Sequence, residues 1–205
     1  MWLLKSCFPL FIGYFLSFYI GNAPKYAIDS QLSDEVQACY GFIAMPVFVI
    51  GMLNNFIFNP LLHRMAILWE DRNISEFRRQ IILQICAIVF ITTICIIGAW
   101  MIGIPVLSWM YHTNLAEYKT ELLIILTGGG FLGLSGLLNA MITVVRFQKS
   151  VAWGYGVVAV MAFLLSDPIV QSYGIMGAAG LYTILMGGLS ICFGGFLIVG
   201  VYKKR

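Results

Sequence analysis

Polar side chains recur at helical spacing within an apolar stretch near residue 140 of this chain. Asn139, Thr143 and Arg146 are four and three positions apart, so they share one face of a helix. Inside a bilayer, each polar group costs free energy unless it meets a partner or water. Two interpretations are open. The stripe forms hydrogen bonds between helices, with Arg146 extending to the lipid headgroups, or it lines a water-filled cavity for a polar, anionic substrate.

Other polar residues of the apolar stretches fit the same two interpretations. Asn55 and Asn59 are four positions apart and share a helix face. Lys5 lies in the first apolar stretch and would add a positive charge to a cavity wall. Asp167 is the one carboxylate within a stretch, and it lies close to an end. This shortage of carboxylates argues against a proton or sodium relay built within the chain.

The sequence holds no set of residues typical of catalysis. No Ser/His/Asp or Cys/His group, phosphate-binding loop or pair of buried carboxylates can be assembled from it. The five cysteines are scattered through apolar stretches without a C-x-x-C pair, and neither histidine belongs to a ligand cluster. We therefore expect no enzymatic activity, no metal site and no cofactor.

Six apolar stretches must position these polar side chains. Each is long enough to cross about 30 Å of hydrocarbon as a helix. The chain is 60% hydrophobic and 10% charged, with a mean hydropathy of +0.91, and a soluble globule of this size cannot hide so much apolar surface. The stretches are residues 2–21, 38–59, 81–110, 122–145, 152–170 and 174–202. The prediction is an all-α, polytopic membrane protein with one six-helix unit over residues 1–205.

Basic residues gather on one side of this pattern. If consecutive stretches cross in alternate directions, ten of the twelve Lys and Arg residues lie on the side of both termini, and Lys25 and Lys119 lie on the other. An excess of Lys and Arg marks the cytoplasmic side. We therefore expect both termini in the cytoplasm and anionic lipid headgroups beside the basic residues. The net charge of +3 gives no reason to expect a nucleic-acid partner.

The connections between the stretches are expected to be short. Residues 22–37 should form a loop with Pro24, and Pro60 should start an amphipathic interfacial segment over residues 61–69. The first stretch could imitate a secretory signal peptide. Because Pro9 interrupts it and no cleavage site precedes a soluble domain, we expect a retained helix.

Small residues cluster on the fourth stretch. Gly128, Gly129 and Gly130 continue into Gly133 and Gly136. They predict close helix–helix packing, since van der Waals contact drives helix association in lipid. Such glycines also let helices slide and bend, which suits a transporter.

Three groups of residues, in order along the chain, carry a resemblance to a known family. The groups are Leu3-Leu4-Lys5 with Pro9-Leu10 and Asn22-Ala23-Pro24-Lys25-Tyr26-Ala27-Ile28; Glu70-Asp71-Arg72 with Phe77-Arg78-Arg79; and Tyr173-Gly174-Ile175-Met176-Gly177-Ala178-Ala179. Together they resemble the C-terminal half of the polysaccharide flippases that export lipid-linked O-antigen and teichoic-acid repeat units. One departure is Ser166-Asp167-Pro168, where the family more often shows an upstream Asn and an Ile-Pro pair.

The resemblance implies membership of the multidrug/oligosaccharidyl-lipid/polysaccharide exporter superfamily. Its members have two six-helix lobes around a central cavity, work by alternating access and lie in the bacterial inner membrane. This chain would supply one lobe, as a fragment, a split-gene product or a dimerising half-transporter. Its partners would be membrane lipids, a polyprenyl-diphosphate-linked oligosaccharide, and a matching N-terminal six-helix lobe or a second copy.

The resemblance also implies roles for individual residues. Lys5 and Arg146 would contact phosphate or acidic sugars. Sugar hydroxyls would be bound by Asn55, Asn59, Asn139 and Thr143. Asn22 and Lys25 would act at the outer exit or hold the structure of a loop.

Two other functions remain open at this point. An ion-coupled exporter of small molecules, of the multidrug type, would need carboxylates that a missing half of the transporter could carry. A non-transporting membrane assembly subunit would need no polar stripe.

Overall fold

In the computed structural model, residues 2–203 are described, with the side chains of residues 2–10, 59 and 149 left out of the description. This part of the chain is almost entirely helical and contains no strand. Its helices are α1 (Trp2–Gln31), α2 (Asp34–Glu70), α3 (Ile74–Gly98), α4 (Ile104–Tyr111), α5 (Lys119–Val144) and α6 (Lys149–Lys203). A π-helical turn, Ala99–Gly103, joins α3 to α4, and a 3₁₀ turn, Ala116–Tyr118, precedes α5. The prediction of an all-α fold is confirmed.

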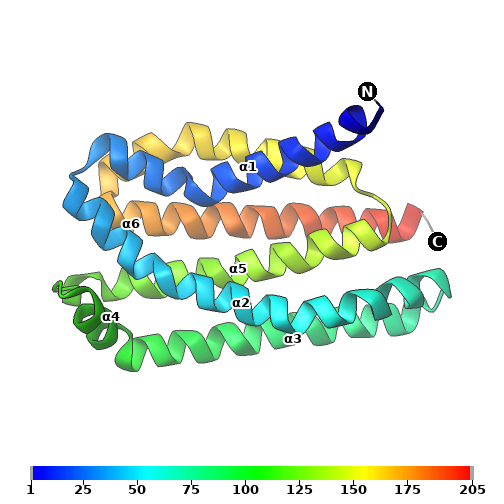
Figure 1. Ribbon diagram of the computed structural model, residues 1–205, viewed down its shortest axis with the longest axis horizontal. Coiled ribbons are helices and arrows are strands. Elements are labelled where there is room, and N and C mark those ends of the chain that lie inside the picture. Colours follow the sequence, from blue (N-terminus) through cyan, green and yellow to red (C-terminus); the bar gives the residue numbers. More distant parts are fainter. Residues whose placement is uncertain (1, 204–205) are drawn as a thin grey trace.

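The long helix α6 consists of two arms that run in opposite directions (Figure 1). The bend lies at Gly174, whose φ of 56° and ψ of −135° are not helical. A side chain would strain this backbone, whereas glycine adopts a positive φ freely. The sequence predicted a fifth stretch ending at residue 170 and a sixth beginning at 174. The structure replaces the short loop between them with a sharp bend.

Two connections predicted from prolines are wrong. The helix α1 continues through Pro24 to Gln31, so most of the predicted loop at residues 22–37 is helical. The helix α2 likewise continues through Pro60 to Glu70, so residues 61–69 are not a separate interfacial segment. Each proline removes one backbone hydrogen bond, but within a packed bundle neighbouring helices and local adjustments tolerate that loss.

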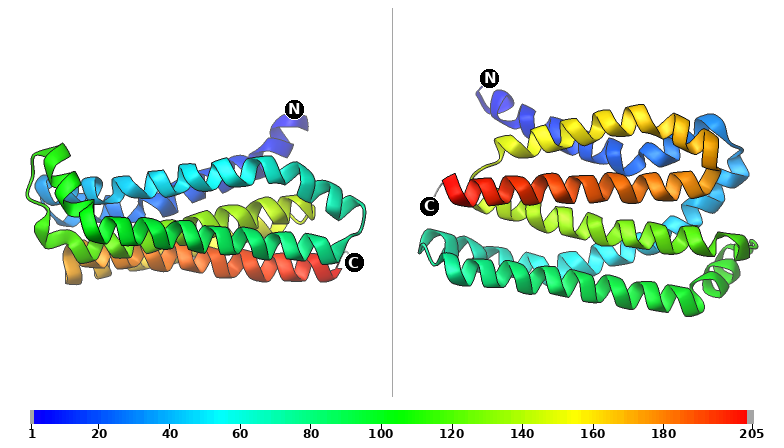
Figure 2. Two further views of the ribbon diagram at one scale, coloured as in Figure 1. Left: turned by 90° about the horizontal axis from the view of Figure 1, so that it is seen from below. Right: turned by 180° about the vertical axis from the view of Figure 1, so that it is seen from behind.

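The helices lie side by side along the long axis of the molecule (Figure 1). Figure 2 shows α1 and α2 on one side of the bundle, with α5 and both arms of α6 behind them. The helices α1 and α2 meet at the two-residue connection Leu32-Ser33, and they diverge toward the other end (Figure 1). The core lies where α6 packs against α5 and α1 and where α2 packs against α5, and its largest fully buried side chains include Phe77, Phe193 and Leu126.

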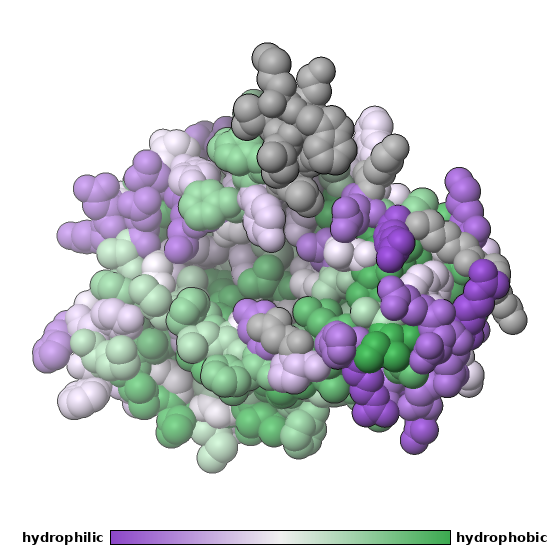
Figure 3. All heavy atoms as spheres, turned by 45° about the vertical axis from the view of Figure 1, so that its right-hand side comes forward, coloured by the Kyte–Doolittle hydropathy of each residue, from purple (hydrophilic) through white to green (hydrophobic). Residues whose placement is uncertain are grey.

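Apolar surface covers the middle of the bundle and charged residues lie at its ends (Figure 3). Four helical segments of the described residues are long and apolar enough to cross a membrane: Asp34–Phe58, Ile74–Tyr111, Ala116–Val144 and Ser150–Lys203. The last of these contains the bend at Gly174. These lengths support a membrane protein, whereas six separate crossings stay a prediction.

Candidate functional site: a polar groove between two diverging helices

The clearest candidate site is a groove of about 450 Å³ between α1 and α2. Its floor is formed by α5 and the second arm of α6. The space-filling view shows this region as a hollow between the upper and lower helices (Figure 3). The residues that line the groove are Gly21, Asn22, Lys25, Tyr40, Ala44, Val47, Phe48, Gly51, Met52, Asn55, Ile125, Leu132 and Tyr182.

Three of the residues predicted to bind substrate lie in this groove. Asn22 and Lys25 line it from α1, and Asn55 lines it from α2. Asn22 and Lys25 are half-buried and Asn55 is exposed. The Asn22 side chain donates a hydrogen bond from Nδ2 to Phe18 O at 2.9 Å, which leaves its Oδ1 as an acceptor. The groove therefore combines one cationic group with two amides.

The position of Lys25 differs from the prediction. The sequence placed Lys25 in an outer loop, but the extension of α1 to Gln31 places it inside a helix, facing the groove. It is the one charged residue among the described residues that line the groove. A single ammonium group in an otherwise polar and apolar groove favours a ligand with negative charge.

The polar stripe of α5 extends along the groove side of that helix. Leu132 lines the groove, and Asn139 lies seven residues, or nearly two turns, further along. Asn139 is half-buried and Thr143 is exposed, while a Cβ at Gly136, between Leu132 and Asn139, would meet no atom within 4 Å. Thr143 Oγ1 donates a hydrogen bond to Asn139 O at 3.0 Å. This face of α5 is thus polar and open beyond the groove.

Arg146 does not continue the stripe, so that part of the prediction is wrong. The helix α5 ends at Val144, and Arg146 lies in the following turn with a positive φ of 58°. Its guanidinium Nη2 is 3.7 Å from Glu70 Oε1, and both side chains are largely exposed. Arg146 lines a separate pocket at the end of the bundle, together with Trp69 and Arg72. The structure therefore groups Arg146 with the end of α2 rather than with Asn139.

Two further predicted site residues, Lys5 and Asn59, have side chains outside the described residues. Both lie in helices, α1 and α2 respectively. The structure therefore brings together Asn22, Lys25 and Asn55, with Asn139 and Thr143 beyond them on α5.

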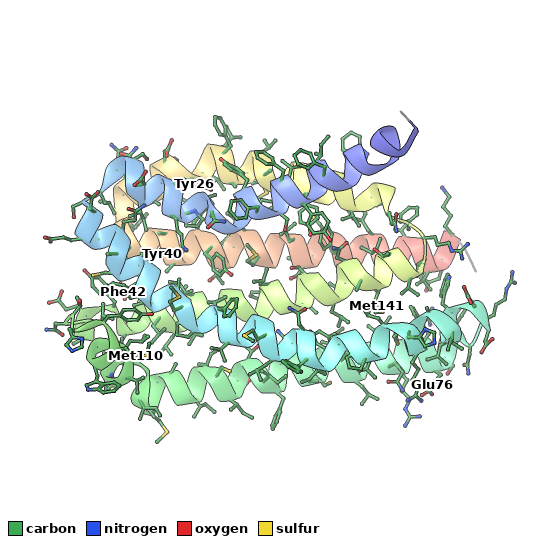
Figure 4. The ribbon with its side chains drawn as sticks, in the orientation of Figure 1. Tyr26, Tyr40, Phe42, Glu76, Met110 and Met141 are labelled. Carbon is green, nitrogen blue, oxygen red and sulfur yellow. The ribbon has the colours of Figure 1, made fainter. Side chains whose placement is uncertain are left out.

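Sequence reasoning missed two tyrosines of the groove. Tyr40 and Tyr182 line it although they are only 2% and 7% exposed. Figure 4 shows Tyr40 near the end of the bundle where α1 and α2 meet, far from Glu76 at the other end. Nothing in an apolar stretch distinguishes a groove tyrosine from a core tyrosine, so no sequence signal marks these positions.

No cluster of three or more His, Cys, Asp or Glu side chains that could hold a metal ion occurs among the described residues. The comparisons with known proteins add no assignment: no family model, no curated protein and no solved structure matched this chain.

Proposed function

We propose that the chain is one lobe of a membrane exporter that moves lipid-linked oligosaccharide from the cytoplasmic to the outer leaflet by alternating access. The observation that carries this proposal is the groove between α1 and α2, which is lined by Asn22, Lys25 and Asn55 in an otherwise mainly apolar bundle. Moving a sugar chain and a diphosphate through about 30 Å of hydrocarbon requires such a polar path.

The chemistry of the groove fits the two parts of that substrate. Lys25 would pair with phosphate or an acidic sugar. The amides of Asn22 and Asn55 both donate and accept hydrogen bonds, as sugar hydroxyls do. Asn139 and Thr143 would extend the same surface along α5. The polyprenyl tail would stay in the lipid at the open side between the two diverging helices.

A groove of this kind also calls for a partner. The Lys25 ammonium and the amides of Asn22 and Asn55 would be costly to leave facing lipid, because hydrocarbon offers no hydrogen bonds. A matching N-terminal six-helix lobe, or a second copy of this chain, would cover the groove and complete a cavity. The outer face of α3 carries no such requirement, since Val89, Phe90 and Ile94 present only apolar surface there.

In this proposal the two arms of α6 each cross the bilayer, which gives six crossings with α1, α2, α3 and α5. The turn between α2 and α3 and the turn between α5 and α6 lie at the same end as both described termini (Figure 1). Arg72, Arg78 and Arg79 flank the first of these turns. This excess of basic residues supports a cytoplasmic location for that end.

The test is restoration of surface glycan in a flippase-null bacterial strain that co-expresses this chain and a matching N-terminal lobe. Lys25→Gln should abolish most of the restoration at normal membrane abundance, and Lys25→Arg should keep part of it because the charge is retained. The matched control is Lys119→Gln, since Lys119 is exposed outside the groove and lies 5.0 Å from the centroid of the Trp100 ring. Normal restoration by Lys25→Gln would contradict the role of the groove.

Export of small cationic dyes by the same pair, without restoration of glycan, would instead support the multidrug type of exporter. If both lobes are present at normal abundance and neither dye export nor glycan restoration is seen, the result would support an assembly subunit.

A further inference from the structure

Polar side chains lie buried and unpaired between α2, α3 and α5, beside the groove. Asn54 and Gln84 are each 3% exposed and Thr92 is 9% exposed. The atoms without a hydrogen-bond partner are Asn54 Oδ1 and Nδ2, Gln84 Oε1 and Nε2, and Thr92 Oγ1. We call these three residues the polar seam.

Glycines of α5 bring the polar seam against that helix. Asn54 of α2 packs with its amide nitrogen against Gly133, where a Cβ would collide with it. A Cβ at Gly130 would lie 2.8 Å from Thr92 Oγ1 of α3. Because Gly130 and Gly133 are three apart, the two contacts lie on neighbouring positions of one α5 face. Gln84 lies eight residues before Thr92 on the buried face of α3, which is about 12 Å along the helix.

Such atoms are costly to leave unpaired. A buried amide or hydroxyl without a hydrogen bond loses its interaction with water and gains nothing in return. The three buried serines of the described residues all have partners, because Ser135, Ser166 and Ser190 donate to backbone carbonyls. Apart from Glu121 Oε2 near the start of α5, the polar seam holds all of the buried side-chain nitrogen and oxygen atoms of the described residues that lack a partner, so it calls for a ligand.

The balance of donors and acceptors identifies the ligand. The two amides and the hydroxyl offer three oxygen acceptors, together with N–H and O–H donors. A cation would serve only the oxygens and an anion only the donors. The buried carboxylate oxygen without a partner among the described residues, Glu121 Oε2, lies nine residues before Gly130 on α5, about 13 Å along the helix, so an ion in the seam would have no counter-charge beside it. Water both donates and accepts, and typically makes about three hydrogen bonds in buried polar sites.

We propose that the polar seam is a buried water-binding site. Water molecules there join the α2–α3 pair to α5 through Asn54, Gln84 and Thr92. This inference does not depend on the transported substrate. It also assigns separate roles to two adjacent residues, because Asn55 faces the groove while Asn54 faces the seam.

The direct test is magnetisation transfer from water to side-chain amide nitrogens, measured by solid-state NMR on the full chain in lipid bilayers. Asn55 in the groove serves as the internal reference for a hydrated amide. We expect Asn54 and Gln84 to receive magnetisation from water as Asn55 does. Transfer to Asn55 without transfer to Asn54 and Gln84 would overturn the proposal, because the two buried amides would then be dry or paired with each other.

A pair of isosteric variants provides an independent readout. Thr92→Val removes a hydroxyl that binds water, so it should lower the melting temperature and weaken the transfer to Asn54. The control is Thr93→Val on the same helix, because Thr93 is exposed and its hydroxyl already donates to Val89 O at 2.7 Å. A higher melting temperature for Thr92→Val would mean that the hydroxyl is unpaired and would overturn the proposal. A sodium-specific rise in the melting temperature would also overturn the proposal, because it would indicate a bound cation. In that outcome sodium, but not choline, would raise the melting temperature of the wild-type chain, and sodium would have no such effect on Thr92→Val.

Discussion

The two sides of α5 satisfy their buried polar groups in different ways. Toward α6, Thr183 Oγ1 lies 2.8 Å from Ile124 O and Ser190 Oγ lies 2.9 Å from Phe131 O. Toward α2 and α3, the polar seam makes no direct hydrogen bond. The first contact is direct and dry, and its geometry is fixed by pairs of atoms. The second depends on exchangeable water. The comparison teaches that α5 and the second arm of α6 form the fixed part of the bundle, and that the α2–α3 pair is the part best able to shift.

The largest expected effect is at Gly128, where α5 packs tightly against side chains of α6. A Cβ there would lie 2.6 Å from Tyr182 Cδ1 and 3.0 Å from Thr183 Oγ1. Because Tyr182 is buried, its ring has little room to move. We expect Gly128→Ala to lower the free energy of unfolding by about 1–3 kcal/mol, as overpacking does. Denaturant titration in mixed micelles measures it. No loss would show that the contact is not tightly packed.

The two hydroxyl bonds across the same contact should contribute less. In the double variant Thr183→Val/Ser190→Ala, each bond to an α5 carbonyl is lost. Both hydroxyls also lie within hydrogen-bond distance of carbonyls of their own helix. We expect a total loss of roughly 1 kcal/mol in the free energy of unfolding, since such interhelical bonds average about 0.6 kcal/mol. A loss below the error of the titration would remove the distinction between the two sides of α5.

A stabilising effect of similar or smaller size is expected at Gly136. A Cβ there meets nothing within 4 Å, so Gly136→Ala should gain up to about 1 kcal/mol from the higher helix propensity of alanine. The same titration measures the gain. A clear destabilisation would mean that another helix or the partner lobe packs at this position.

The smallest net change is expected at Gly133. Its Cβ would meet the amide end of Asn54, a flexible group that can turn if water fills its surroundings. The helix-propensity gain and the displacement of Asn54 should then nearly cancel, within about 0.5 kcal/mol. A loss as large as that of Gly128→Ala would contradict the hydrated seam, because it would require a rigidly held Asn54.

Much of the fold could be predicted from the sequence because apolar length and charge asymmetry are strong signals. The stretch over residues 122–145 corresponds closely to α5, and the bend at Gly174 falls where the sixth stretch was predicted to begin. The helix ends were harder, because Pro24 and Pro60 do not end helices within this bundle. Tertiary packing, which no local pattern reports, decides whether such a proline is tolerated.

The candidate site was predictable only in part. Asn55 and Asn139 were identified because polar residues within apolar stretches are conspicuous. Helical spacing then extended the stripe to Arg146, which fails because α5 ends two residues earlier. The difference between Asn54 and Asn55 was not predictable, since both are asparagines in the same stretch and only the packing of α2 on α5 separates them.

The most direct test of the central claim compares two exposed surfaces of the bundle by cysteine accessibility. In a cysteine-free chain co-expressed with a matching N-terminal lobe, Asn55→Cys lies in the groove and Phe90→Cys lies on the outer face of α3. Both side chains are exposed in the lobe, so exposure alone cannot distinguish them. We predict that a charged, membrane-impermeant thiol reagent labels Asn55→Cys and leaves Phe90→Cys unlabelled, and that lipid-linked oligosaccharide slows the labelling. Labelling of Phe90→Cys but not Asn55→Cys would contradict the claim that substrate moves along this groove.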